Sequence, residues 1–239
     1  MATTTWQRPT ARVDATTARE KRNRNRKTAV LVGALFLVAT ATFLVSSALI
    51  TPILGSPGYL AAVGRNSTLV IAAALIALID GLAVVGIAAA LYPILSPRHP
   101  ALAVAYTGMR TAELAIIAAY VLAPLMLVSL SRSETAADSS TMGDLLVGLR
   151  HWTLLFIYLF NGVAGLVLSY MLLRTRLVPR ALPIFGLVGY AALFIGASLD
   201  ALGFINTAAG AGMVALVPGG LFELALPIWL FVRGFRPTR

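Results

Sequence analysis

The sequence predicts an all-α fold: a polytopic membrane protein built as a six-helix transmembrane bundle, with both termini in the cytoplasm. Hydrophobic residues make up 59% of the 239 residues and charged residues only 12%, whereas soluble domains carry about 25% charged residues. Several apolar runs are long enough to cross about 30 Å of hydrocarbon as helices. The basic residues are also distributed very unevenly between the two sides that these runs separate.

The apolar runs define six expected spans, because polar and turn residues interrupt the runs at their ends. In chain order the spans cover residues 28–50, 68–95, 101–130, 150–173, 181–204 and 213–233. We therefore expect one transmembrane domain over residues 28–239. Its two longest connections are residues 51–67 and residues 131–144. The second contains Glu134, Asp138 and Asp144 and is expected to be a solvated outer loop.

The first 27 residues are polar and basic, and we expect them to form a disordered cytoplasmic tail. They contain eight basic and two acidic residues. This basic tail can contact anionic lipid headgroups, although its main expected role is to set the orientation of the first span. A cleaved signal peptide also begins with a basic segment. However, the apolar run over residues 28–50 is longer than a signal core and favours an uncleaved span.

The distribution of Lys and Arg predicts the orientation. Fifteen of the nineteen basic residues fall on the side of the tail, one lies within a span, and three lie on the other side: Arg65, Arg132 and Arg150. Because basic residues gather on the cytoplasmic side of membrane proteins, both termini are expected inside. The same placement explains the net charge of +10 without nucleic acid as a partner; the expected partner is the lipid bilayer.

Ionisable residues inside the expected spans mark the candidate site. Such a residue at the bilayer centre costs about 2.5–3.5 kcal/mol on insertion scales, so it usually faces the bundle interior and is paired. Arg110 and Glu113 are three positions apart and share one helix face. A helical rise of about 1.5 Å per residue places five polar residues in one layer near the midplane. The polar layer consists of Asp80, Arg110, Glu113, Asn161 and Glu223.

Asp200 lies closer to the outer end of its span than the polar layer does. We expect it to meet water and treat it as a possible separate polar site. The glycines Gly162, Gly165, Gly186 and Gly196 would allow neighbouring helices to approach closely, within one protomer or between protomers.

The polar layer has two interpretations. It can be a structural clamp, in which Arg110 bridges Glu113 and one other acid. It can instead bind a ligand, an ion or protons, because the spans contain four acids and one base, so that not every acid is paired. We expect a transporter-like or sensor-like protein that binds a small molecule or ion in this layer. The alternative is a structural or assembly protein, and the third possibility is an intramembrane enzyme.

Several chemistries have no residues to support them. The chain contains no cysteine, which excludes disulfides and thiolate metal ligands. Its only lysines are Lys21 and Lys27 in the tail, so a retinal Schiff base has no intramembrane lysine. The two histidines, His99 and His151, lie near opposite ends of the spans and form neither a facing pair nor an HExxH motif. We expect no cofactor and no metal site.

Four segments carry a resemblance to a known family: LYPIL (91–95), GMRTAEL (108–114), RLVPRALPIFGLVG (176–189) and FELALPIWLFVRGF (222–235). They resemble the domain-of-unknown-function 4386 family, predicted multi-span membrane proteins found mainly in bacteria. The family pattern maps onto Arg110, Glu113, Leu177 to Arg180, Glu223, Trp229 and Leu230. The resemblance implies location in a bacterial cytoplasmic membrane and a recurring role for these residues. It implies no particular activity.

Overall fold

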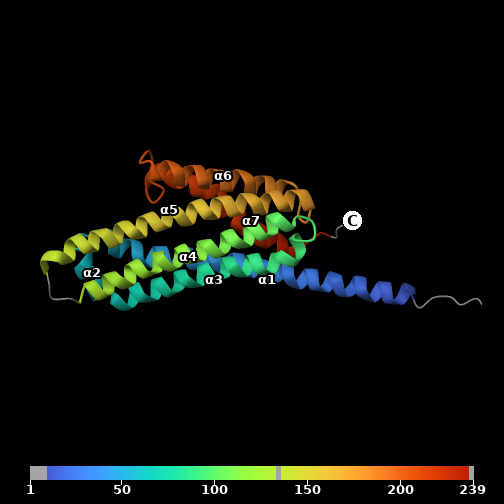
Figure 1. The fold of residues 1–239 in the computed structure, drawn as a ribbon, viewed down its shortest axis with the longest axis horizontal. Helices are drawn as coiled ribbons and strands as arrows, with labels where there is room; N and C mark the ends of the chain where they lie inside the picture. Colours follow the sequence, from blue (N-terminus) through green and yellow to red (C-terminus); the bar gives the residue numbers. More distant parts are fainter. Residues whose placement is uncertain (1–9, 133–135, 237–239) are drawn as a thin grey trace, which may run out of the picture.

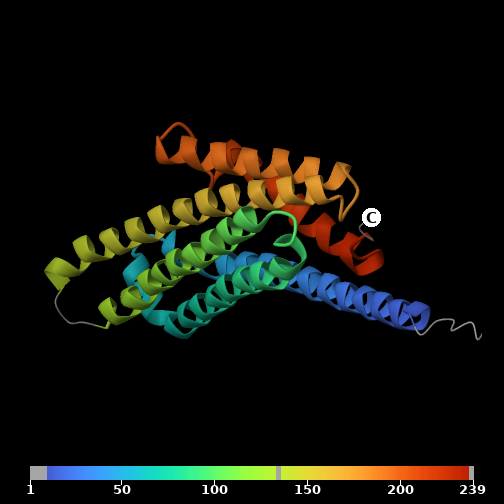
Figure 2. The same ribbon diagram turned by 45° about the vertical axis from the view of Figure 1, so that its right-hand side comes forward.

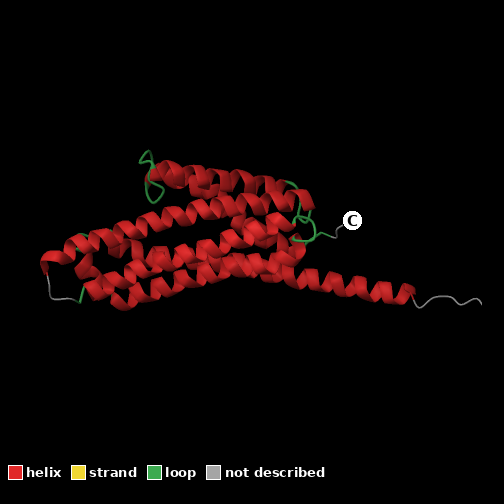
Figure 3. Ribbon diagram, viewed as in Figure 1, coloured by secondary structure: helices red, strands yellow, loops and turns green. Residues whose placement is uncertain are grey.

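The computed structural model describes residues 10–132 and 136–236, and the side chains of residues 23–132 and 140–236. Every regular element in these ranges is a helix (Figure 3). The α-helices are α1 (Thr10–Leu54), α2 (Tyr59–Arg65), α3 (Ser67–Leu95), α4 (Pro100–Leu130), α5 (Ala136–Thr175), α6 (Ala181–Ala201) and α7 (Val217–Val232). A 3-10 helix, η1 (Gly210–Leu216), precedes α7. Six helical segments in the described ranges are long and apolar enough to cross a membrane, as the sequence predicted.

The six long helices form a closed ring. Each packs against the next in the order α1, α3, α4, α5, α6 and α7, and α7 packs back against α1. The start of α1 and the end of α7 lie toward the same end of the elongated bundle (Figure 1). We call this the terminal end and the opposite one the distal end. Whether the terminal end faces the cytoplasm remains a prediction.

Contacts between α1 and α7 close the ring at the terminal end. The guanidinium group of Arg26 donates hydrogen bonds to the carbonyl oxygens of Leu230 (3.1 Å) and Phe231 (2.5 Å). The last carbonyls of a helix have no partner within it, and α7 has no basic residue in its last turn. Arg26 therefore adds donors from α1 to the end of α7, where the Leu230 carbonyl also accepts a hydrogen bond from the backbone N–H of Gly234 at 3.0 Å.

The main buried core lies where all six helices meet. It includes Phe36 of α1, Leu91 of α3, Leu168 of α5 and Phe222 of α7, each at most 2% exposed. A second cluster at the distal end joins α1, α2, α3, α4 and α5 but not α6 or α7. The distal part of the bundle therefore has fewer helices, and α6 ends short of α5 in the views of Figures 1 and 2.

Two helices extend beyond the expected spans. Helix α1 begins at Thr10, inside the segment that we expected to be a disordered tail. A helix lengthens from an existing span without a new nucleation step, and the segment contains few helix-breaking residues. Residues 1–9 lie outside the described residues.

Helix α5 begins at Ala136, so most of the expected outer loop is helical instead. Gly143 of this extension lies against Tyr59 and Leu60 of α2, and Leu146 is 7% exposed. Packing against α2 therefore stabilises a segment that is too polar to be a span. Asp144 remains exposed, and Glu134 lies outside the described residues.

Helix α7 is shorter than the expected last span, 213–233, because its first part is the 3-10 helix η1. Pro218 stands at the start of α7, a position where its missing N–H and its restricted φ cost nothing. Gly219 lies one residue further on and contacts Gly189 of α6. This close approach brings the first two turns of α7, with Glu223, against the interior of the bundle.

Candidate functional site

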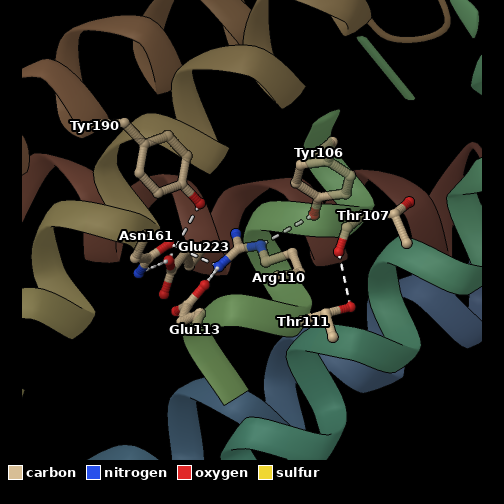
Figure 4. Close-up of polar contacts among 8 residues, drawn as sticks. All are labelled: Tyr106, Thr107, Arg110, Thr111, Glu113, Asn161, Tyr190 and Glu223. Carbon is tan, nitrogen blue, oxygen red and sulfur yellow. Dashed lines mark hydrogen bonds and ion pairs between the residues drawn. The ribbon is translucent and has the colours of Figure 1, made fainter. Parts of the chain in front are cut away.

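Arg110 is the centre of a hydrogen-bonded network inside the ring (Figure 4). Its side chain is 1% exposed, although it comes from the middle of α4. Its Nη1 atom donates to Glu113 Oε2 at 2.7 Å and to Asn161 Oδ1 at 3.0 Å. Its Nε atom lies 3.4 Å from the hydroxyl oxygen of Tyr106, one turn earlier on the same helix. The guanidinium group thus has partners on its own helix and on α5.

Glu223 of α7 is the second centre of the network. Its Oε1 atom accepts hydrogen bonds from the hydroxyl group of Tyr190 (3.1 Å) and from Asn161 Nδ2 (3.4 Å). Its Oε2 atom accepts one from Thr40 Oγ1 (3.3 Å). Asn161 therefore connects Arg110 to Glu223, and the network ties α1, α4, α5, α6 and α7 together.

Close helix packing places Tyr190 in this network. The glycine Gly165 of α5 lies directly under the ring of Tyr190, where a Cβ atom would overlap the ring atoms. Gly186, one turn before Tyr190, lies against Ser169 and Phe222. The ring of Tyr190 also contacts that of Phe222 edge-on, with centroids 5.5 Å apart. These contacts fix the Tyr190 hydroxyl beside Glu223.

The network borders a cavity of about 240 Å³. Residues from all six long helices line it, and most of its surface is apolar, including Phe36, Phe43 and Ile157. Its polar side is formed by Asp80, Arg110, Glu113, Asn161 and Glu223, together with Thr40 and Tyr158. The five residues of the predicted polar layer therefore line one cavity.

Asp80 of α3 differs from the other acids of the cavity. It lines the cavity but makes no hydrogen bond or ion pair with any described residue, whereas Glu113 and Glu223 both do. The charges that act on it are those of Glu113, Glu223 and Arg110. Three carboxyl groups and one guanidinium group thus share the cavity. Of these three carboxyl groups, only that of Glu113 pairs with the guanidinium group, so the cavity has an excess of acidic groups.

The lining of the cavity reaches the outer surface of the bundle on α1 and α7. Two of its lining residues, Leu44 of α1 and Leu224 of α7, are 59% and 43% exposed. In a membrane, side chains on the outer surface of a span face lipid. The lining of the cavity therefore includes side chains that would face lipid in a membrane.

Asp200 does not join this cavity. The expectation that it meets water was wrong, because it is 9% exposed and accepts hydrogen bonds from the backbone N–H (2.6 Å) and the hydroxyl group (2.5 Å) of Thr207. His151 Nε2 lies 3.9 Å from its other oxygen. The structure thus places Asp200 where it holds the loop that follows α6, apart from the five residues of the polar layer.

Sequence reasoning missed three polar residues of the network: Tyr106, Tyr190 and Thr40. Tyr106 precedes Arg110 by four positions, a spacing that puts two helical residues on one face, so the sequence held a usable signal for it. Tyr190 and Thr40 are unremarkable within apolar runs, and their roles follow only from how α6 and α1 pack. Within the described residues, no group of three or more His, Cys, Asp or Glu is placed to hold a metal ion.

The fold and the cavity define the class of protein: a multi-pass membrane protein with a mostly apolar cavity, lined on one side by polar residues, among six helices. The chain belongs to the family described as a domain of unknown function, DUF4386, whose family model matches residues 31–234. The match includes every residue that lines the cavity. No curated protein and no solved structure matches the chain.

Proposed function

We propose that the protein binds a small cation in the cavity, as a transporter or a sensor does. The observation that carries this proposal is the carboxyl group of Asp80, which lines the cavity without a hydrogen-bond or ion-pair partner among the described residues. A carboxyl group inside a membrane is costly and marks ion pathways or ligand sites. It needs a cation or a proton, because an unpaired carboxylate in a low-dielectric surrounding is strongly disfavoured.

The walls of the cavity suggest the kind of cation. Most lining residues are apolar, and two of them, Leu44 and Leu224, are exposed on the outer surface of the bundle. Its volume of about 240 Å³ is slightly below the range of about 300–1,000 Å³ in which drug-sized ligands bind. A small alkylammonium ion, with a charged end for Asp80 and an apolar end for the walls, fits these properties better than a fully hydrated inorganic ion.

A structural role remains the alternative for part of the cluster. Arg110, Asn161 and Glu223 have hydrogen-bond partners on several helices, as a clamp between helices requires. Asp80 has no such partner in the part of the chain that the structure describes, so a purely structural cluster leaves it unexplained. We infer that the bonded residues form the frame of the site and that Asp80 is its binding group.

The experiment is a thermal-stability measurement on detergent-purified protein with cations added at constant ionic strength. The probes are sodium, potassium and the alkylammonium ions from methylammonium to hexylammonium, with N-methylglucamine as the background cation. Asp80→Asn removes the carboxylate group of Asp80 from the cavity. Asp144→Asn is the matched control, because it makes the same chemical change at an exposed acid outside the cavity.

We expect at least one alkylammonium ion to stabilise the wild-type protein and the Asp144→Asn variant but not Asp80→Asn. A ligand at 100 times its dissociation constant stabilises the folded state by about 2.7 kcal/mol, equivalent to about 5–10 °C in Tm for a chain of this size. The proposal fails if no probe raises Tm, or if the same rise persists in Asp80→Asn.

We also propose that the terminal end faces the cytoplasm of a bacterium and that the protein resides in its plasma membrane. The fifteen basic residues on the side of the termini support this orientation. Because the chain contains no cysteine, single cysteines can be introduced at Ser96 and Ser140 and labelled with a membrane-impermeant maleimide. Label on intact cells at Ser140→Cys alone agrees with the proposal, and label at Ser96→Cys alone reverses it.

A further inference from the structure

A second hollow, of about 660 Å³, lies at the terminal end of the bundle. It is separate from the cavity and shares no lining residue with it. It lies between the connection from α3 to α4 and the connection from α5 to α6, which lie at the same end in Figures 1 and 2. We call it the arginine hollow. Its lining residues are Arg98, His99, Leu173, Arg174, Arg176, Arg180 and Ile184.

The positive charge of the arginine hollow is not balanced by the part of the protein that the structure describes. No acidic residue lines the hollow, and its four arginine side chains make no hydrogen bond or ion pair with described residues. Of the four, Arg174 makes a cation–π contact: its guanidinium carbon lies 6.0 Å from the centre of the Tyr170 ring. Four like charges around one hollow repel each other. All four are exposed, so water screens part of this repulsion, and an anion in the space between them would reduce it further.

The backbone of Arg176 supports a role for its side chain. Its φ of 54° is the only positive φ among the described residues other than glycine. Helices commonly end with a glycine in this left-handed conformation, because a side chain there is strained. The chain has an arginine at this position instead. A strained residue that persists in a fold points to a function for that residue.

The connection that presents Arg176 and Arg180 is firmly held. Leu177 and Val178 between them are 1% and 0% exposed, and the Leu177 carbonyl accepts a hydrogen bond from the backbone N–H of Arg236 at 2.8 Å. The two arginines therefore project from a fixed turn. A site that is ordered before binding loses less conformational entropy when the ligand arrives.

We propose that the arginine hollow binds the phosphate group of an anionic phospholipid. Guanidinium groups pair with phosphate through two parallel hydrogen bonds, and basic pockets between transmembrane helices suit lipid headgroups. An apolar path leads from the hollow along α6: Ile184 is 50% exposed, and Val188, one turn further, is 58% exposed. An acyl chain attached to the phosphate would lie along this path, whereas a soluble phosphate compound has no apolar chain to place there.

The test is mass spectrometry of the intact protein in detergent micelles, titrated with dioleoyl phosphatidic acid and, separately, with dioleoyl phosphatidylcholine. The double variant Arg176→Gln/Arg180→Gln removes two charges from the hollow. The double variant Arg65→Gln/Arg132→Gln is the matched control, because it removes two exposed arginines at the distal end. We expect the first to weaken phosphatidic acid binding about tenfold or more, as the loss of charge-assisted bonds predicts, and the control to leave it unchanged.

Two further variants separate this proposal from simpler explanations. Arg176→Gly fits the left-handed backbone, so we expect it to raise thermal stability while weakening lipid binding. Ile184→Ser should weaken binding of the lipid through loss of its apolar path. An equal loss of affinity in the distal control would overturn the proposal, since general surface charge would then explain binding. Equal affinity of the wild-type protein for phosphatidylcholine would also overturn it. Displacement of the lipid by millimolar inorganic phosphate or glycerol 3-phosphate, with Ile184→Ser binding normally, would instead assign the hollow to a soluble phosphate.

Discussion

The most informative perturbation of the network is Arg110→Gln. Arg110 is 1% exposed, and its Nη1 atom makes the hydrogen bonds to Glu113 and Asn161 at 2.7 and 3.0 Å. Glutamine is shorter and uncharged, so Glu113, which is 2% exposed, loses its counter-charge without gaining access to water. Breaking a buried ion pair on one side costs about 3–5 kcal/mol, because the remaining charge stays buried. We expect Arg110→Gln to lose stability in this range.

The double variant Arg110→Gln/Glu113→Gln tests the reason for that loss. It removes both charges, so no carboxylate is left without a counter-charge. We expect it to lose about 1–3 kcal/mol, the cost of imperfect hydrogen bonding by buried polar groups, and therefore to be more stable than Arg110→Gln alone. Non-additivity of this kind is the signature of two residues that act as a unit.

The assay is equilibrium unfolding in mixed micelles with increasing sodium dodecyl sulfate, followed by tryptophan fluorescence. Thr111→Ala is the control on the same helix, because Thr111 is exposed and, among the described residues, its hydroxyl group hydrogen-bonds to the backbone oxygen of Thr107 alone (Figure 4). It should stay within about 0.5 kcal/mol of wild type. A loss below about 1 kcal/mol for Arg110→Gln, or a double variant that loses the sum of the single losses, would refute the clamp argument.

Three further predictions concern Asp80, two glycines and Tyr59. Asp80→Asn should leave the free energy of unfolding unchanged or raise it, because it removes a costly intramembrane charge that has no partner in the described protein. Gly189→Ala should destabilise the protein, since its Cβ would lie 2.7 Å from the Gly219 nitrogen. In contrast, Gly108→Ala, with nothing within 4 Å, should stabilise α4 by up to about 1 kcal/mol. Partial burial and the 2.6 Å hydrogen bond to Asp144 raise the pKa of Tyr59 from 10.0 to about 12, and Asp144→Asn should lower it.

The measurements for these predictions are direct. The same unfolding assay measures the free energy of unfolding of Asp80→Asn and of the two glycine variants. Equal effects of Gly189→Ala and Gly108→Ala would contradict the close packing of α6 on α7. Absorbance at high pH, compared with Tyr59→Phe, gives the third. Because the folded-state pKa of Tyr59 is raised, its contribution to stability is present below pH 10 and is lost as the pH rises through 12. An unchanged titration in Asp144→Asn would show that the hydrogen bond has no part in the shift.

The predicted fold followed from local properties of the chain. The number and order of the spans depend on the length of each apolar run, which any segment must have to cross the hydrocarbon. The depth of Asp80, Arg110 and Glu223 along their helices depends only on the helical rise. For these reasons the six spans and the membership of the polar layer could be predicted without knowledge of how the helices pack.

The parts that were missed depend on contacts between distant segments. The helical start of α5 was expected to be a loop, because its stability comes from α2 and not from its own composition. Periodicity does not say which way a residue on an apolar helix faces. Only packing decided that Tyr190 and Thr40 would bond to Glu223 and that no described residue would pair with Asp80.

The sequence by itself determined that the chain crosses the membrane and at what depth its charges lie, because the bilayer imposes the same demand on every span. The tertiary structure alone decided which of those charges are neutralised and where a cavity remains. Pairing requires atoms within about 3 Å, and here that distance depends on the glycine contacts that set the spacing of the helices.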